Sequence, residues 1–151
     1  MTYKQIMVAI DESETSALAL KEAVRLAKDQ KAELRVVHII DESIINPAES
    51  HVDYATLWQT YQEEGQRFID RISAELRQLK VKFNCHLVVL KPFTGRLAEK
   101  IIEEAESWPA DMLVLGTHGR RGFHHLFLGS VAESVMRIAT MPVLLVREQK
   151  V

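Results

Sequence analysis

The sequence predicts an α/β fold built on a parallel sheet, and three observations lead to this prediction. Five short runs rich in Val, Ile and Leu recur along the chain, and stretches with the apolar periodicity of helices lie between them. Most of the apolar runs barely alternate with polar residues, which is typical of strands that helices cover on both faces. Regular alternation of strand and helix predicts parallel strands with right-handed helical crossovers.

Each expected strand is a short, mostly apolar run. The five are Ile6–Ile10, Leu34–Ile40, His86–Leu90, Met112–Leu115 and Val143–Val146. Helices are expected between these runs, where apolar residues at helical spacing share one face. These residues are Ala17, Leu20, Val24 and Ala27 in the first helix, Tyr61, Phe68, Ile72, Leu76 and Leu79 in the second, Leu97, Ile101 and Ala105 in the third, and Val131, Val135 and Ile138 in the fourth.

Residue types that cap helix N-termini precede three of the expected helices. They are Ser13, Thr94 and Ser130. Ser130 and Glu133 also have the spacing of a capping box, in which each side chain bonds to the backbone of the other residue. The stretch Asp41–Ala55 is long for a connection, and it is interpreted either as a lid or partner surface or as a simple mobile connection.

Composition and charge limit the functions open to the chain. Its 151 residues are 47% hydrophobic and 26% charged and show no internal repeat or linker, so residues 1–151 are expected to form one domain. The formal net charge of −2 gives no general attraction to nucleic acid or to an anionic membrane, so any anion site must be local. Cys85 is the lone cysteine, and no signal peptide or membrane span is evident, so the expected compartment is the cytoplasm.

A glycine-rich loop is the most informative motif. Four of the six glycines, Gly116, Gly119, Gly122 and Gly129, lie close together, after an expected strand and before an expected helix. Glycine lets backbone N–H groups approach a ligand closely, and a helix start adds unpaired N–H donors and the positive end of the helix dipole. The loop is therefore interpreted as a phosphate site, to which Arg120 and Arg121 could add charge; the alternative is that its glycines only serve turns.

Other uses of this loop can be weighed from its residues. The hydroxyl of Ser130 either caps the following helix or donates to a phosphate. The loop is not a Walker A motif, because no Gly-Lys-Ser/Thr follows the glycines. It is not the dinucleotide-binding fingerprint either, because its spacing differs and it follows the fourth strand.

The sequence resembles the universal stress protein family. The spacing Gly116-x2-Gly119-x9-Gly129-Ser130 matches that family's ATP-binding motif in full. Supporting similarity comes from the segments Ile6–Ser13, His38–Asp41 and Met141–Val146, so that the resemblance runs from about Lys4 to Arg147.

The resemblance implies an adenine nucleotide α-hydrolase-like fold. This is an open five-stranded parallel sheet in the order 3-2-1-4-5, with helices on both faces and a ligand crevice at the carboxyl ends of strands 1 and 4. It also implies ATP, or AMP or ADP, as the ligand, with Mg²⁺ accompanying the triphosphate. The implied nucleotide-binding residues are Ala9, Asp11, Ile39, Gly116, His118, Gly119, Gly129, Ser130 and Val131.

Roles for individual residues follow in part from this resemblance and in part from chemistry. By resemblance, Asp11 contacts the ribose or the nearby base edge, and the backbones of Ala9 and Ile39 recognise adenine. A carboxylate suits ribose hydroxyls, although Asp11 could instead cap the helix near Ser13. The family also implies a homodimer formed by antiparallel contact of Met141–Val146 with its copy; the alternative is an ordinary edge strand.

Metal and acid–base chemistry find little support in the sequence. His118, His124 and His125 share a loop and Cys85 adjoins His86, but no pair has the usual spacing of a zinc site apart from the closely spaced His118-x5-His124, so no metal site is predicted. Cys85 is expected in the core rather than as a nucleophile. No catalytic Ser/His/Asp set is recognisable, and no nucleic-acid partner is predicted because the two tryptophans form no stacking platform.

Three functional hypotheses follow. The first is an ATP-binding, homodimeric regulatory protein of the stress response, with at most slow hydrolysis because no catalytic base or P-loop lysine is evident. The second is a dimeric interaction protein that does not depend on nucleotide. The third is an enzyme that splits ATP to AMP and pyrophosphate, which ranks last because Asp11-Glu12-Ser13-Glu14 stands where such enzymes carry a Ser-Gly-Gly-x-Asp-Ser loop.

Overall fold

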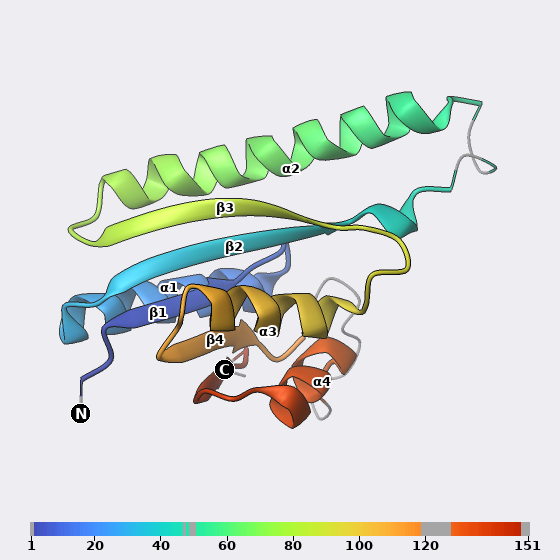
Figure 1. The fold of residues 1–151 in the computed structure, drawn as a ribbon. Coiled ribbons are helices and arrows are strands. Elements are labelled where there is room, and N and C mark those ends of the chain that lie inside the picture. Colours follow the sequence, from blue (N-terminus) through green and yellow to red (C-terminus); the bar gives the residue numbers. More distant parts are fainter. Residues whose placement is uncertain (1, 47, 49–50, 119–127, 149–151) are drawn as a thin grey trace.

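A five-stranded sheet in which every pair is parallel runs through the molecule in the order β3-β2-β1-β4-β5 (Figure 1). The structure is a computed structural model, and it describes every residue except 1, 47, 49–50, 119–127 and 149–151. The strands are β1 Gln5–Ala9, β2 Glu33–Asp41, β3 Lys82–Leu90, β4 Met112–Gly116 and β5 Val143–Val146. This topology confirms the predicted fold class and strand order.

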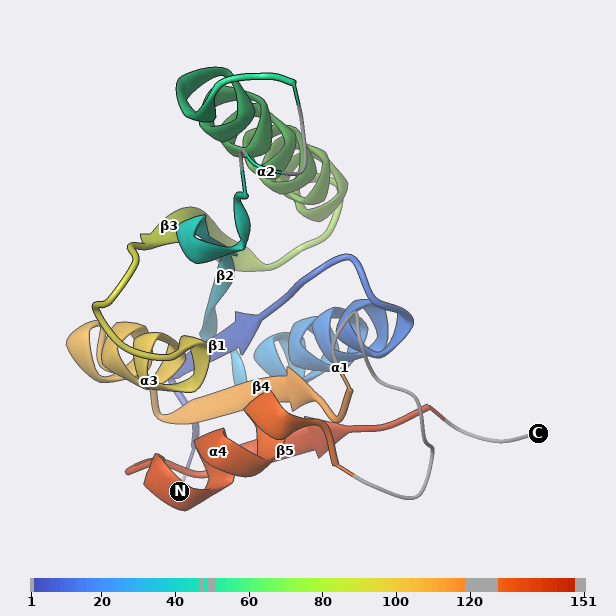
Figure 2. The same cartoon turned by 90° about the vertical axis from the view of Figure 1, so that its right-hand side faces the viewer.

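Helices cover both faces of the sheet, with α1 and α2 on one side and α3 and α4 on the other (Figure 2). They are α1 Glu14–Gln30, α2 Tyr54–Arg77, α3 Leu97–Ser107 and α4 Ser130–Ile138, and a 3-10 helix, η1, spans Glu42–Ile44. The strands β1 and β4 are neighbours, yet the helices that follow them lie on opposite faces. This divergence opens a crevice at the carboxyl ends of the two strands.

Each face of the sheet has its own apolar core. On the side of α1 and α2, Ile6 and Val8 of β1 pack with Leu20 and Phe68. On the other side, Met7 of the same strand packs with residues of α3 and α4. Successive residues of β1 are therefore buried on alternate faces, which explains why its sequence is a continuous apolar run.

The long strand β3 extends further than its sequence indicated. It begins at Lys82 rather than His86, and it pairs with β2 along its full length, from Lys82 opposite Glu33 to Leu90 opposite Asp41. Because β3 is an edge strand, its first residues are only partly covered, and polar side chains such as Asn84 are tolerated there. The apolar pattern therefore reveals only its second half.

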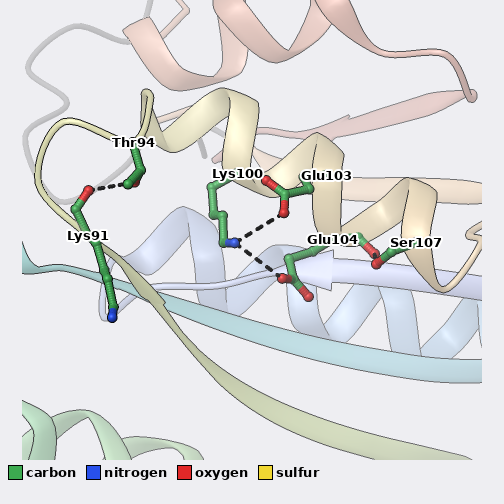
Figure 3. Close-up of polar contacts among 6 residues, drawn as sticks. All are labelled: Lys91, Thr94, Lys100, Glu103, Glu104 and Ser107. Atoms are coloured by element: carbon green, nitrogen blue, oxygen red, sulfur yellow. Dashed lines mark hydrogen bonds and ion pairs between the residues drawn. The ribbon is translucent and has the colours of Figure 1, made fainter.

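Of the three predicted helix caps, only the first is confirmed. Ser13 caps α1 by accepting a hydrogen bond from the Ser16 amide at 3.2 Å. The N-cap of α3 is Arg96 instead of Thr94, whose hydroxyl donates to the Lys91 carbonyl at 2.6 Å (Figure 3). Threonine suits a helix cap, but the Thr94 hydroxyl is already hydrogen-bonded within a local turn that precedes the helix.

The cap of α4 is Gly129, so the predicted cap at Ser130 is wrong. The Gly129 amide donates to the Thr117 carbonyl at 2.7 Å, which fixes Gly129 in an extended conformation and makes Ser130 the first helical residue. Within the part of the chain that the structure describes, no side chain caps this helix, and the carboxylate of Glu133 instead accepts a hydrogen bond from Arg137 at 3.0 Å. The predicted capping box therefore does not form.

The second helix is also shifted from its expected position. Asp53 caps it by accepting a hydrogen bond from the Thr56 amide at 2.8 Å, and the helix ends before Leu79, which is 40% exposed instead of lying on its apolar face. The expected connection Asp41–Ala55 is shorter than predicted because its ends belong to β2, η1 and α2. No helix within the described ranges has both the length and the apolarity to cross a membrane.

Candidate functional site

A cavity of about 490 Å³ lies at the carboxyl edge of the sheet, the edge that faces the viewer in Figure 2. Its walls come from the ends of β1, β2 and β4, from the turn after β1, and from parts of η1, α2, α3 and α4. A volume of this size is within the range of pockets that hold small molecules and cofactors. The fold therefore has a cavity of suitable size where the crevice was expected.

Eight of the nine predicted site residues line this one cavity. They are Ala9, Asp11, Ile39, Gly116, His118, Gly129, Ser130 and Val131. The ninth, Gly119, lies outside the described residues, as do Arg120 and Arg121. The topology has thus brought together segments that are far apart in the chain, because β1 lies between β2 and β4.

The turn after β1 is held by a small network of hydrogen bonds. The Asp11 carboxylate accepts from the Ser13 amide at 2.8 Å, and the Asp11 amide donates to the Ser16 hydroxyl at 2.7 Å. Because Ser13 is the cap of α1, the alternative role of Asp11 as the helix cap is not observed. The network instead fixes the Asp11 carboxylate at the wall of the cavity.

The end of β4 packs directly on the first turn of α1. A Cβ atom at Gly116 would lie 2.7 Å from the Thr15 hydroxyl and 2.8 Å from its carbonyl carbon, which is too close for any other residue. The Thr15 and Ser13 hydroxyls both bond to the His118 carbonyl, the second at 3.5 Å. The glycine here therefore allows two backbone segments to touch, and the start of the glycine-rich loop is attached to α1.

Backbone hydrogen bonds also fix the two ends of this loop. The Thr117 amide donates to the Val146 carbonyl at 2.9 Å, and the Thr117 carbonyl accepts from the Gly129 amide at 2.7 Å. Thr117 itself is buried. One residue therefore connects the start of the loop to the end of β5 and to the beginning of α4.

Two features of the cavity suit an anionic ligand. The first turn of α4 contributes Ser130, Val131 and Ala132 to the wall, and among the described residues no side chain caps it, so its amides suit an acceptor. The side chain of His118 is bonded to Thr117 through Nδ1 at 3.0 Å, and its buried Nε2 has no partner within the described residues. Buried polar atoms nearly always have a partner, so this ring nitrogen fits a ligand that supplies one.

The charged side chains on the cavity wall are acidic. Asp11, Glu12, Asp41 and Glu64 line it, whereas none of the lining residues that the structure describes is Lys or Arg. An anion at this site must therefore be stabilised by the helix start, by backbone amides or by an accompanying cation.

Sequence reasoning missed the part of the wall that η1 and α2 contribute. Ile44, Tyr61, Glu64 and Gly65 line the cavity, as does His38, whose Nδ1 lies 2.9 Å from the Ile10 carbonyl. The periodicity of α2 marks Tyr61 as a residue on the apolar face. It does not show that this part of the helix lies over the cavity rather than over the core.

Cys85 and His86 are not among the residues that line this cavity. Cys85 is partly covered and packs against the core on the side of α1 and α2, and burial raises the pKa of its thiol. Burial and the nearby Arg35 lower the pKa of His86. No group of three or more potential metal ligands occurs among the residues that the structure describes, whereas His124 and His125 lie outside them.

Comparison with known proteins identifies the family. Residues 2–147 match the universal stress protein family. The chain belongs to this family. A universal stress protein of Methanocaldococcus jannaschii is 32% identical over 148 residues, which cover 98% of this chain and 84% of that protein.

Solved structures of universal stress proteins share the fold. The structure of a second M. jannaschii family member superposes with a TM-score of 0.82 at 30% identity, over the whole of both chains. A universal stress protein from Archaeoglobus fulgidus, solved in complex with dAMP, has a TM-score of 0.69 at 22% identity over 97% of this chain and 99% of that one. Another family member, solved in complex with cAMP, has a TM-score of 0.69 at 21% identity over 99% and 100% of the two chains.

Proposed function

We propose that this universal stress protein is a cytoplasmic, homodimeric regulator of the stress response that binds ATP in the cavity at the carboxyl edge of its sheet. Residues 1–151 would form its single domain. The observation that carries the proposal is the convergence of eight predicted site residues on one cavity whose wall includes an uncapped helix start. The adenine nucleotides bound by the two family members described above support it.

The phosphates are placed at the first turn of α4 in this proposal. Amides of Ser130 and Val131 donate to phosphate oxygens there, and Gly129 lets the chain approach closely. The Ser130 hydroxyl donates to a phosphate as well, since it does not cap the helix. Gly119 belongs to the same phosphate-binding set by its place in the motif, and the buried Nε2 of His118 supplies a further polar contact.

The position of the phosphates also determines where the ribose and the base lie. The Asp11 carboxylate accepts hydrogen bonds from the ribose hydroxyls, and the backbones of Ala9 and Ile39 contact the base. Mg²⁺ is expected with the triphosphate because it neutralises phosphate charge beside the acidic wall. The ligand could equally be ADP or AMP in the cell, and the same residues would hold it.

Binding would act as a switch rather than as a step in fast catalysis. The chain has no P-loop lysine, and no catalytic base is recognisable, so any hydrolysis is expected to be slow. A nucleotide that binds only the folded protein stabilises it by mass action, by about 2.7 kcal/mol when its concentration is 100 times Kd. Partners would then recognise the surface that the bound form presents.

The direct test is calorimetry with the nucleotide-free protein, Mg²⁺ and ATP. We expect micromolar or tighter binding, which corresponds to about −8 kcal/mol. A rise in the unfolding temperature with ATP concentration is the expected second signal. Absence of binding at millimolar ATP would contradict the proposal and leave a dimeric interaction protein whose glycine-rich loop is only structural.

The dimer part of the proposal rests on β5. Its four residues are all partly exposed, and β4 is its one partner among the described strands, so it is an apolar edge strand. The carbonyls of Pro142 and Val146 bond to β4 and to Thr117, respectively. Because backbone groups alternate in direction along a strand, those of Val143 and Leu145 face the open edge.

This geometry gives a specific test of the dimer. Leu145→Pro removes an amide that points away from β4, so we expect the fold to persist while the dimer dissociates to monomer. Sedimentation measurements compare it with Leu145→Ala, which shortens the same side chain but keeps the amide and is expected to remain dimeric. A wild-type monomer, or a Leu145→Pro variant that is still dimeric, would argue against pairing through β5.

A further inference from the structure

The outer wall of the cavity, made by α2 and η1, contains none of the residues assigned to nucleotide binding above. Tyr61, Glu64 and Gly65 of α2 and Ile44 of η1 line it. We propose that Tyr61 is a further binding residue of this site and packs its ring against the purine base of the bound nucleotide. This inference rests on the proposed function and adds a recognition element from a helix outside the glycine-rich motif.

Close packing at Gly65 explains why Tyr61 reaches the cavity. A Cβ atom at Gly65 would lie 3.1 Å from Ile40 Cγ2 and 3.1 Å from Leu87 Cδ1, so the backbone of α2 lies close against β2 and β3 at this point. Tyr61 is one helical turn earlier and therefore lies on the same face of α2. The close approach brings its side chain to the carboxyl end of β2, beside the cavity.

The first half of α2 does not belong to the core. All buried residues of this helix lie at or after Gly65, whereas Tyr61 is only partly covered. Figure 1 shows the N-terminal part of α2 extending to the carboxyl edge, beyond the sheet residues that the rest of the helix covers. An aromatic residue at this position has little core to pack against, and Tyr61 is one of the residues that line the cavity.

Polarity determines which end of a nucleotide lies beside Tyr61. The start of α4 and the helix α2 both contribute to the cavity wall, and these two elements lie far apart in Figure 2. Near α2 the wall includes apolar surface from Ile40, which lies against Gly65, and from Ile44. Asp41 and Glu64 also lie there, and their charge disfavours phosphate. Phosphates at the start of α4 therefore place the flat, apolar base beside α2.

The ring of the neighbouring Trp58 lies against that of Tyr61 and provides a probe of it. The two ring centroids are 6.0 Å apart with an interplanar angle of 49°. The other tryptophan, Trp108, is on the opposite face, where Arg35 lies 4.7 Å above its ring. In a Trp108→Phe background the emission of Trp58 therefore reports specifically on this wall.

The binding test uses Tyr61→Ala, Tyr61→Phe and a matched control in the same helix. Removal of a base-stacking aromatic residue is expected to lower ATP affinity about tenfold to a hundredfold. Tyr61→Phe keeps the ring and should bind within about threefold of wild type. Thr60→Ala changes an exposed neighbour of Tyr61 that does not line the cavity, and its affinity should be unchanged. Urea unfolding of each variant identifies any loss of the fold.

A spectroscopic measurement separates a direct role from a structural one. Saturating ATP should change the emission of Trp58 in the Trp108→Phe protein, because the base comes to lie beside Tyr61. Wild-type affinity in Tyr61→Ala, or unchanged Trp58 emission at saturating ATP, would overturn this inference while leaving the proposed function intact. Failure of the wild-type protein to bind ATP would instead overturn the proposed function, and the role of Tyr61 with it.

Discussion

Gly129→Val is expected to lower the affinity for ATP about a hundredfold or more, to below the measurable range, while the chain stays folded. Gly129 lines the cavity directly before the first turn of α4, where the backbone must approach the phosphates. A branched side chain at this point fills the space that the ligand needs and separates the phosphates from the helix amides. Calorimetry with Mg²⁺ and ATP measures the loss.

The conformation of Gly129 makes this variant informative. Its φ of −64° and ψ of 156° are extended, so valine can adopt them, and the hydrogen bond from its amide to Thr117 remains. Leu128→Val is the matched control, because Leu128 is adjacent, exposed and absent from the cavity wall. Binding by Gly129→Val at wild-type strength would mean that the phosphates lie elsewhere.

Gly116→Ala is expected to cause the largest loss of stability among single-methyl changes at this site. The added Cβ meets the backbone of Thr15 as well as its hydroxyl, at 2.7 to 2.9 Å, so β4 and α1 must separate. Overpacking of this kind lowers the free energy of unfolding by about 1–3 kcal/mol. Urea denaturation provides the measurement, as a lower transition midpoint.

Gly65→Ala is the natural comparison for this prediction. Its Cβ would contact only the ends of the Ile40 and Leu87 side chains, at 3.1 Å, and these can move by a few tenths of an ångström. Alanine in a helix interior is also favoured over glycine by about 0.5–1 kcal/mol. The Gly116→Ala protein should therefore have a clearly lower free energy of unfolding than the Gly65→Ala protein. Equal midpoints would contradict the claim that contact between β4 and α1 requires glycine at residue 116.

The strands at the centre of the sheet could be predicted from the sequence because burial on both faces demands apolar side chains. Ile6, Met7 and Val8 of β1 are fully buried, and they form a continuous apolar run in the sequence. The start of β3 could not be predicted in this way, because an edge strand accepts Lys82 and Asn84. The convergence of Asp11 and Gly116 needed the strand order, which the family resemblance supplied and local patterns did not.

The errors at helix starts have a related cause. Ser130 has the residue type of a cap, but a long-range bond from the Gly129 amide to Thr117 decides where α4 begins. Tyr61 fits the helical period of α2, but periodicity indicates only a face and not which part of the sheet that face covers. In both cases contacts between distant segments decide the outcome, and single-sequence patterns contain no information about them.

The two backbone bonds of Thr117 have a consequence for how the loop can vary. Because its amide is held by Val146 and its carbonyl by Gly129, backbone hydrogen bonds fix both ends of the intervening segment, and the Ser13 and Thr15 hydroxyls also hold its start. Loop-closure entropy rises only with the logarithm of length, so doubling the number of residues between fixed ends costs about 0.6 kcal/mol. The length of this segment can therefore change during evolution, to suit a different ligand, with little penalty to the stability of the fold.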